Sequence, residues 1–394
     1  MEPGAPLVTK YDPWSPALQD DPYPTYRWLR DASPVHHVAE RDLWVLSRHA
    51  DVTAALRDPA SFSSASGIAL DETDPGVPTL LTLDPPRHDD LRRLVSRAFT
   101  PRTVADLEPR IDEVVDELLA PHEGDASFDF MDFAAALPTI VIAELLGLPI
   151  ADREMFRRWV ERVISLDPEV LMRNAGAALE LFGYLRSQID ERRTNPRDDL
   201  ISALLAADVD GERLNSAELV GFVLLLLAAG FETTKNLLGN GLWLLDSHRD
   251  SWARLATQPE LVPAFVEEVL RFESPVVGLA RTTTRDVTMH DVTIPAGGRV
   301  QVLYAAANRD EREFATPDPD TFALRRVNDR HLAFGHGIHH CLGAPLARLE
   351  ARIAFERLLT RMPDFAVGNP TRLYSLYVRG FANLPVEATI KEPV

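Results

Sequence analysis

Residues 334–343, FGHGIHHCLG, carry the only cysteine of this 394-residue chain, Cys341. A single thiol cannot form a disulfide within its own chain, so its role is core packing, nucleophilic attack or metal binding. Gly335 and Gly337 precede the cysteine and Gly343 follows it. Because glycine lets a backbone turn tightly and approach a flat partner closely, the stretch predicts a tight turn built around one thiol.

The segment after this turn, APLARLEARIAFERLL, has the period of an amphipathic helix that begins at Ala344. A thiolate before such a helix is stabilised by a metal cation and by nearby N–H groups, which favours a haem-iron ligand over a nucleophile. A buried cysteine in a turn stays open as the structural alternative. A zinc site from His336, His339, His340 and Cys341 is the weaker one, since adjacent turn residues supply a tetrahedral set poorly and no CxxC partner exists.

The spacing Phe334-Gly-x-Gly-x-His339-x-Cys341-Leu-Gly343 closely resembles the haem-binding loop of the cytochrome P-450 monooxygenases. The resemblance implies that Cys341 is the iron ligand and that the cofactor is haem b. It also places Phe334, Gly335, His339 and Gly343 at that cofactor.

Composition and length favour one large domain over residues 1–394. With 45% hydrophobic residues the chain can bury a large core, and no Ser/Gly tract, long charge run or internal repeat marks a linker. Residues 1–13, MEPGAPLVTKYDP, lack the basic and apolar parts of a secretory signal or membrane anchor, which predicts a cytoplasmic protein. The 41 basic and 60 acidic residues give a net charge of −19, which argues against nucleic acid as a partner.

The first third of the chain alternates short elements with prolines. Residues 21–35 and 49–59 have helix patterns that end at prolines, and residues 43–47, LWVLS, indicate a strand. Residues 61–83 form a Ser/Gly/Asp/Pro-rich stretch without a period, which is typical of a lid or binding loop as well as of plain surface decoration. Residues 103–191 follow a mostly helical pattern.

Residues 84–99, DPPRHDDLRRLVSRAF, begin a helix with prolines and acids in its first turn. His88 and Arg92 are four residues apart and therefore share one helical face. A solvated face is the ordinary reading of that spacing. In the resembled family this DPPxHxxxR segment contacts the haem propionates, and buried propionates need cationic or N–H partners.

Residues 218–245 form the longest apolar run. A transmembrane helix is the obvious alternative, but Glu232 and Lys235 would lie near its centre, where charges are costly, so we expect a buried central helix. Its segment Ala229-Gly230-Phe231-Glu232-Thr233-Thr234 resembles the family's Ala-Gly-x-(Asp/Glu)-Thr motif.

The likeness in this helix implies that Thr233 and Glu232 are catalytic. The Thr233 hydroxyl would hydrogen-bond dioxygen at the haem, and Glu232 would help relay protons from solvent. Gly230 would border the cofactor and Ala229 the substrate pocket. Lys235 departs from the family, where apolar residues are common at this point, and we expect it to face away from the haem.

Glu268 and Arg271 are three residues apart on a predicted helix, where most such pairs are surface ion pairs of little consequence. The resemblance makes them the family's Glu-x-x-Arg pair, which a third member, Arg326, completes as a buried network that supports the cysteine loop. Arg325 is the alternative third member.

After Pro275 the pattern turns to β-branched and polar residues, which predicts strands with a turn at residues 295–298. By resemblance Arg281 binds a second propionate, while Val276, Val277 and Leu279 face the substrate pocket. Plain strand packing is the alternative for these three apolar residues. The region 163–184 covers the pocket in the family, but no residue of it receives a role.

The resemblance covers essentially the whole chain and implies a mainly helical fold with a smaller β region, a triangular prism with haem between residues 218–245 and 344–359. It implies a monomeric monooxygenase that inserts one atom of O2 into a small organic substrate. The chain has no flavin or nicotinamide fingerprint, so electrons would come from NAD(P)H through a reductase and a ferredoxin-type donor. A docking face could include Arg93, Arg97, Arg348 and Arg352. The alternatives are a peroxide-driven peroxygenase and a non-catalytic haem-binding or gas-sensing protein.

Overall fold

The computed structural model describes residues 11–70, 79–163, 175–208, 211, 213–326 and 330–393. The chain folds into two compact units, of which the first takes residues 1–84, 267–341 and 372–379 and the second takes the rest. Each unit therefore joins stretches that are far apart in sequence, and helix α14 (Val262–Phe272) contains one of the crossings. The single domain expected from composition stays a prediction.

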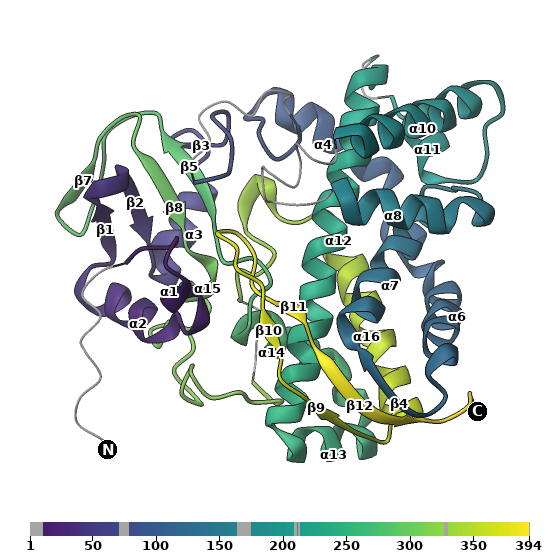
Figure 1. The fold of residues 1–394 in the computed structure, drawn as a ribbon. Helices are drawn as coiled ribbons and strands as arrows, with labels where there is room; N and C mark the ends of the chain where they lie inside the picture. Colours follow the sequence, from purple (N-terminus) through teal and green to yellow (C-terminus); the bar gives the residue numbers. More distant parts are fainter. Residues whose placement is uncertain are drawn as a thin grey trace. The chain divides into compact units, whose positions relative to one another are not determined.

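The first unit contains a five-stranded sheet in the order β1-β2-β8-β5-β3 (Figure 1). Strands β2 and β8 are parallel and the other neighbours antiparallel, with Leu43 opposite Arg299 and Arg281 opposite Val300. The described elements of this unit are α1 (Pro16–Asp20), α2 (Tyr23–Ala32), β1 (Val35–Val38), β2 (Leu43–Leu46), α3 (His49–Arg57), β3 (Phe62–Ser63), β5 (Leu279–Thr283), β6 (Val287–Met289), β7 (Val292–Ile294), β8 (Arg299–Val302) and α15 (Tyr304–Ala307).

Apolar residues on alternate strand positions give this sheet its core. Leu46, Val300 and Val302 are buried and pack with Val52 of α3 and with Tyr304 of α15. Side chains on alternate residues of a strand share one face, so these residues cover a single side of the sheet. The strand at 43–47 and the β region after Pro275 thus appear where the sequence predicted them.

The second unit is mainly helical, with one three-stranded antiparallel sheet in the order β4-β12-β9. Its elements are α4 (Arg87–Ala98), α5 (Pro101–Ala105), α6 (Glu108–Leu119), β4 (Gly124–Asp129), α7 (Phe130–Leu145), α8 (Arg153–Val163), α10 (Ala175–Thr194), α11 (Leu200–Ala206), α12 (Ser216–Ser247), α13 (Arg249–Thr257), α16 (Ala344–Arg361), β9 (Asp364–Val367), β11 (Phe381–Asn383) and β12 (Pro385–Ile390). Strand β10 (Thr371–Arg372) lies at a unit boundary.

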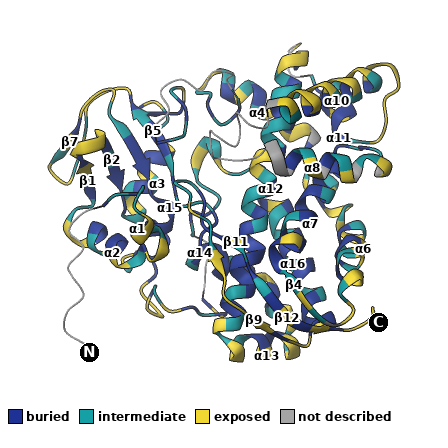
Figure 2. Cartoon of the chain, viewed as in Figure 1, coloured by how far each residue is buried: buried dark blue, intermediate teal, exposed yellow. Residues whose placement is uncertain are grey.

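Helix α12 is the 32-residue centre of the second unit and packs on α7 and α16 (Figure 1). Asn215 caps it: its side-chain oxygen accepts the N–H groups of Ala217 and Glu218, and the Glu218 carboxylate accepts the Asn215 N–H in return. This capping box fixes the start of the helix. Among the described residues α12 is the one helix long and apolar enough for a membrane span. Its second half is nevertheless largely buried within the unit, as the dark blue of Figure 2 shows.

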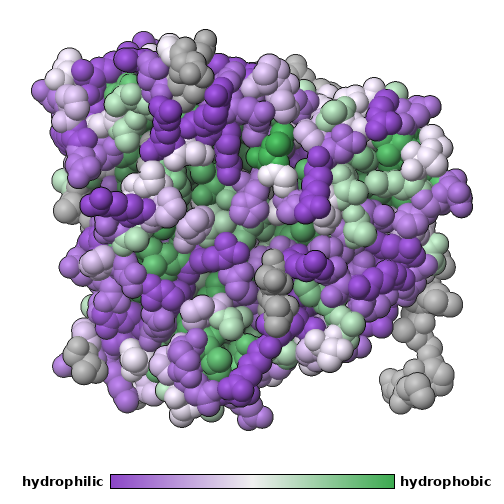
Figure 3. Space-filling view, turned by 180° about the vertical axis from the view of Figure 1, so that it is seen from behind, coloured by the Kyte–Doolittle hydropathy of each residue, from purple (hydrophilic) through white to green (hydrophobic). Residues whose placement is uncertain are grey.

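Polar residues dominate the molecular face in Figure 3, where apolar residues form separate areas between charged ones. The buried apolar residues lie instead in the sheet of the first unit and along α7, α12 and α16 of the second (Figure 2). This division into a charged exterior and apolar interiors follows the hydrophobic burial that drives folding.

Helix α16 buries an acid, Glu350, on its inward face together with Leu346 and Ile353. Burial raises the pKa of the Glu350 carboxyl to about 8, and its Oε2 atom has no hydrogen-bond partner. The folded protein therefore binds a proton between the ordinary glutamate pKa and pH 8, whereas the unfolded chain releases it. By linkage, stability falls as pH rises through that window.

We predict that Glu350→Gln removes this pH-dependent loss of unfolding free energy. The loss amounts to roughly 3–4 kcal/mol at pH 7, because the pKa of the carboxyl is that much higher in the folded than in the unfolded chain. Denaturant unfolding of wild type and variant from pH 5 to 9 should show free energies that diverge in favour of the variant up to about pH 8. Glu387→Gln, at an exposed position of β12, is the matched control. Parallel curves for Glu350→Gln and wild type would show that the buried acid does not titrate in this way.

Candidate active site

The cysteine loop, residues 332–341, is closed by main-chain hydrogen bonds. The Cys341 N–H donates to the Phe334 carbonyl at 2.9 Å, and the His340 N–H to the Gly337 carbonyl at 3.1 Å. Gly335 and Gly337 have φ of 67° and 69°, a conformation that favours glycine. A Cβ at Gly337 would also lie 2.2 Å from the Leu56 carbonyl oxygen, so α3 permits no side chain there.

The loop thus presents one half-buried thiol just before α16, whose N-cap is Gly343. Phe334 is half-buried and lies beside His331, with ring centroids 5.9 Å apart. Within the described residues no three His, Cys, Asp or Glu side chains are grouped so that they could hold a metal ion, so the histidines of the loop form no zinc-type cluster there. The turn predicted around Cys341 is the conformation that the loop adopts.

Glu268, Arg271 and Arg326 meet in the first unit, and all three are buried. Two parallel hydrogen bonds join the Arg271 guanidinium to the Glu268 carboxylate, at 2.8 and 2.9 Å. Arg326 Nε lies 3.4 Å from the same carboxylate, and its other nitrogens donate to the carbonyls of Pro317, Asp318 and Thr321. Burial, followed by the charge of Arg271, lowers the pKa of the Arg326 guanidinium.

A chain of hydrogen bonds leads from this network to the cysteine loop. Arg271 donates to the Asn308 carbonyl at 2.9 Å, and the Asn308 side-chain oxygen accepts the Leu332 N–H at 2.6 Å. The Leu332 carbonyl in turn accepts the Gly335 N–H at 2.9 Å. Because buried polar groups are costly when unpaired, the loss of Arg271 would leave the support of the loop incomplete.

Arg281 provides the test of whether the first unit suits an anionic cofactor. Its side chain on β5 is only 3% exposed, and no carboxylate in the described part of the chain forms an ion pair with it. Burial raises the pKa of the neighbouring Tyr304 phenol, and the Arg281 charge opposes that rise. A buried guanidinium without an acidic partner is expensive, and a propionate is the group that would satisfy it. The residues present therefore fit a haem.

The other predicted propionate contacts, His88 and Arg92, lie on α4, and His339, which was predicted at the cofactor, lies in the cysteine loop. His88 is buried and Arg92 half-buried one turn apart on α4, and His88 Nδ1 lies 2.9 Å from Asp89 Oδ1. In the first unit, His339 Nε2 lies 3.2 Å from the hydroxyl of the buried Ser64. The predicted loop at 61–83 therefore contacts the cysteine loop at Ser64, while its residues 71–78 lie outside those the structure describes.

In α12 the Thr233 hydroxyl donates to the Ala229 carbonyl at 2.6 Å, one helical turn earlier. Both residues lie on a face where Ala229 is exposed and Thr233 half-exposed, although the adjacent Phe231 and Thr234 are buried. A Cβ on Gly230 would lie 2.7 Å from Ile142 Cδ1, so the missing side chain serves the contact with α7.

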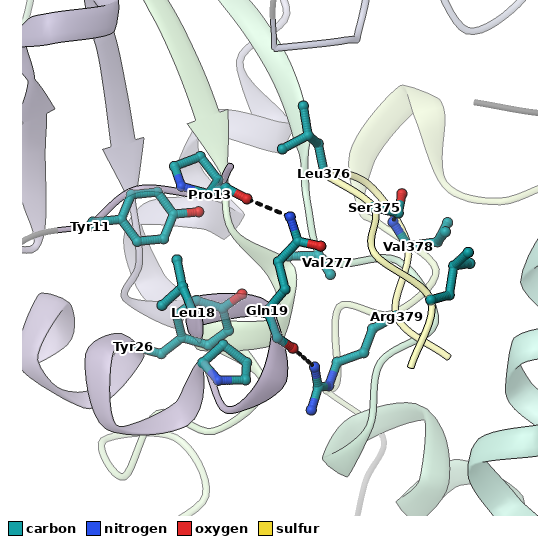
Figure 4. A pocket seen from close by; sticks show the side chains of 12 residues that line it. Tyr11, Pro13, Leu18, Gln19, Tyr26, Val277, Ser375, Leu376, Val378 and Arg379 are labelled. Carbon is teal, nitrogen blue, oxygen red and sulfur yellow. Dashed lines mark hydrogen bonds between the residues drawn. The ribbon is translucent and has the colours of Figure 1, made fainter. Parts of the chain in front are cut away.

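A pocket of the first unit contains Val277, one of the predicted substrate contacts (Figure 4). Tyr11 and Leu18 of the N-terminal segment line one side, and Leu376, Val378 and Arg379 line the other. Val276 bridges to Val378, and Leu279 begins β5, so both take part in the strand pairing that was the alternative reading. Residues 164–174 of the predicted pocket region 163–184 lie outside the described part of the chain.

Three features of the site were not predicted from the sequence. Asn308 connects the buried network to the loop, Ser64 contacts His339, and Lys235 forms an ion pair with Glu232. The first two join residues more than 20 positions apart, for which local patterns carry no signal. The i,i+3 spacing of Lys235 and Glu232 is the signal by which the third could have been found.

Comparisons with known proteins agree on one family. The family model described as "Cytochrome P450" matches residues 32–258 and 255–363. The chain is 44% identical over 365 residues to the cyclomarin C epoxidase CymV of Salinispora arenicola, which covers 89% of this chain and 92% of that protein. It is 43% identical over 392 residues to the vitamin D(3) 25-hydroxylase of Pseudonocardia autotrophica, with 96% of each chain covered.

A solved structure gives the same result for the fold. The crystal structure of CYP109E1 from Bacillus megaterium in complex with testosterone matches with a TM-score of 0.86 at 36% identity. The match covers 94% of this chain and 100% of that one. The mainly helical fold with a smaller β region that the sequence predicted is thereby confirmed.

Proposed function

The chain belongs to the cytochrome P450 family and is a P450 monooxygenase, and from this premise we propose that it oxidises a small, largely apolar organic molecule with O2. One oxygen atom enters the substrate, as hydroxylation, epoxidation or oxidative dealkylation, and the other leaves as water. The observation that carries the proposal is the closed, glycine-bounded loop that presents Cys341, together with the buried Arg281 that lacks an acidic partner in the described chain.

In this proposal Cys341 holds the iron of haem b, Arg281, His88 and Arg92 hold its propionates, and His339 contacts the cofactor. The bound haem supplies the oxygen chemistry, which a thiolate ligand favours. Guanidinium and imidazole groups suit propionates because charge-assisted hydrogen bonds are the strongest available to a buried carboxylate.

Other residues around the haem leave room for it or support the thiolate in our proposal. The Phe334 ring shields the Cys341 sulfur from water. Gly335 and Gly343 approach the cofactor through their bare main chains, as glycine permits. Gly230 borders the cofactor in our proposal, while the space left by its missing side chain is taken by Ile142 of α7. Glu268, Arg271 and Arg326 act only through the loop that they support.

Glu232 and Thr233 handle protons in our proposal. The Thr233 hydroxyl donates to the Ala229 carbonyl, which leaves its oxygen free to accept a hydrogen bond from a water or a reacting group. The Glu232 carboxylate takes up protons from solvent and returns them on the Thr233 side of α12. Both residues belong to one helical turn, so the path between them is short.

The substrate class is proposed from the relatives. The vitamin D(3) 25-hydroxylase and the testosterone-bound CYP109E1 each act on or bind a polycyclic apolar molecule. Vitamin D3 and testosterone are therefore the first probes, with Ala229, Val276, Val277 and Leu279 as pocket residues. We also propose that the protein is a cytoplasmic monomer and a single domain.

We propose that electrons come from NAD(P)H through a reductase and a ferredoxin. The presence of the Glu232–Thr233 pair favours this route over a peroxide-driven reaction and over gas sensing, because neither needs delivered protons. The face proposed for the donor contains Arg93, Arg97, Arg348 and Arg352. Two of these form ion pairs, Arg93 with Asp90 and Arg352 with Glu108, which weakens them as docking charges.

Turnover of a bound probe with NAD(P)H, ferredoxin and reductase, set against turnover with hydrogen peroxide alone, tests the function. We expect oxidised product that requires the electron donor. Product formed only with peroxide would establish the peroxygenase alternative, and haem binding without product under either condition would establish the non-catalytic one.

Thr233→Ala is expected to lower the yield of product per NAD(P)H consumed several-fold and to release peroxide instead. The variant removes the hydroxyl that positions a proton, while haem binding stays intact because the residue holds no cofactor group. Product, peroxide and NAD(P)H are measured together, with Thr257→Ala on the exposed end of α13 as the control. Full coupling in Thr233→Ala would contradict its proposed role.

A further inference from the structure

Lys235 is a lysine in an unusual place. The sequence contains three lysines, Lys10, Lys235 and Lys391. The other residues counted as lysine or arginine are all arginines. Lys235 lies within the apolar α12, next to the buried Asn236 and Leu237, and its side chain is 17% exposed. An ammonium group on a largely buried side chain requires a compensating partner.

The partner is the proposed proton carrier. Lys235 Nζ lies 3.5 Å from Glu232 Oε1, and the Asn236 side-chain amide lies 3.4 Å from the same oxygen. The Glu232 side chain is 15% exposed, and Lys235 Nζ also lies 5.7 Å from the centre of the Phe231 ring. Within the described residues, neither charge of this pair takes part in a second ion pair.

Helix geometry separates Lys235 from the reactive threonine. At about 100° per residue, Glu232 lies about 100° around the axis from Thr233, and Lys235 about 160° from it. Lys235 therefore pairs with the acid from the side opposite to Thr233. If Thr233 faces the haem, as proposed, Lys235 lies away from the haem side of α12.

Because this ion pair is partly buried, solvent screens the attraction between the two charges less than at an open surface. In general an apolar surrounding favours the protonated form of a carboxyl group, and a nearby cation favours the ionised form. The two hydrogen-bond donors, Lys235 and Asn236, also fix where the carboxylate oxygen lies. A proton carrier needs both properties, since it must be ionised in order to accept the next proton.

We propose that Lys235 is a positioning residue for Glu232: it supplies the opposite charge to the carboxylate and holds it beside Asn236 between proton transfers. Lys235 touches neither substrate nor cofactor in this role. The inference rests on the proposed function of Glu232, but the ion pair on which it is built can be tested without any turnover.

The first test uses the small number of lysines. Reductive methylation with carbon-13 labels the three lysines and the amino terminus, and each label gives its own NMR signal. In wild-type holoprotein at pH 7 the Lys235 signal is expected at a chemical shift different from that in Glu232→Gln, because the variant removes the ion-pair partner. The Lys391 signal, which should not move, is the internal control. An unchanged Lys235 signal in the two proteins would overturn the proposal.

The second test compares Lys235→Met with Lys235→Arg in the reconstituted system, with testosterone as the probe. We expect Lys235→Met to lower product per NAD(P)H several-fold, with KM unchanged. Lys235→Arg should restore the product yield, since it restores the charge. Turnover driven by iodosylbenzene, which needs no delivered protons, should be equal in all variants, and Lys391→Met should match wild type.

Failure of the proposed function and failure of the proposed role of Lys235 would give different results. Wild-type protein that makes no product with the electron donor would contradict the proposed function, and the NMR comparison would still decide whether the ion pair exists. Wild-type protein that makes product while Lys235→Met couples fully would contradict the role of Lys235 alone. An unrestored Lys235→Arg would show that charge is not what the site requires.

Discussion

Arg271→Leu is expected to destabilise the protein by about 3–5 kcal/mol and to prevent stable haem incorporation. Arg271 is fully buried and forms two hydrogen bonds with Glu268, as well as donating to the carbonyls of Asn308 and Pro319. Its loss removes two paired hydrogen bonds from the buried Glu268 carboxylate, which keeps the longer contact to Arg326 and the Ala323 N–H. A loss of this size is comparable with the whole stability of many domains, about 5–15 kcal/mol.

The measurements are haem content after purification and the midpoint of denaturant unfolding. Haem content and unfolding midpoint in Arg271→Lys should be little higher than in Arg271→Leu, because a single ammonium cannot reproduce the paired hydrogen bonds of a guanidinium. Arg285→Leu, whose side chain is 68% exposed, is the matched control, and we expect at most about 1 kcal/mol there. A haem-loaded Arg271→Leu protein with the wild-type unfolding midpoint would contradict the network.

Cys341→Ala is expected to abolish monooxygenase turnover and the red-shifted absorption band of the reduced, carbon monoxide-bound haem. The thiolate is the only soft anionic ligand that the chain can offer, since no second cysteine exists. Without it the iron loses the electron donation that favours oxygen cleavage. The loop itself should survive, because its closing hydrogen bonds are made by main-chain atoms.

The spectrum of the reduced carbon monoxide complex and the product yield are compared in three proteins. His340→Ala, at an exposed position one residue earlier in the loop, should keep both the band and the activity. The band should vanish only in Cys341→Ala. A variant without Cys341 that retains the band would require another ligand, and loss of the band in His340→Ala would point to an imidazole.

Sequence patterns predicted those parts of the fold that interactions between neighbouring residues determine. Helix α12 was expected at 218–245 and spans Ser216–Ser247, because its apolar length and the capping box at Asn215 act within a few residues. Helix α2 ends at Ala32, before Pro34, as the proline requires. Strand β4 at Gly124–Asp129 was missed within a region that read as helical. Its pairing partner is β12, more than 250 residues later, so no neighbouring residue indicates it.

The candidate site likewise contains features that local sequence patterns indicate and features that depend on distant residues. The turn around Cys341 could be predicted because glycines at 335 and 337 are needed for its positive φ angles. The hydrogen bonds that Asn308 and Ser64 make to the cysteine loop could not be predicted. Each joins residues that are far apart in the sequence and that meet only in the folded chain. The grouping of Glu268, Arg271 and Arg326 was predicted by resemblance alone, since the spacing of the first two is equally typical of a surface pair.

The bond between the Cys341 sulfur and haem iron is the central claim, and X-ray absorption at the iron edge of the haem-loaded protein tests it most directly. We predict a sulfur atom in the first coordination shell of the wild-type iron and its disappearance in Cys341→Ala. A first shell made only of nitrogen and oxygen in the wild-type protein would contradict the account.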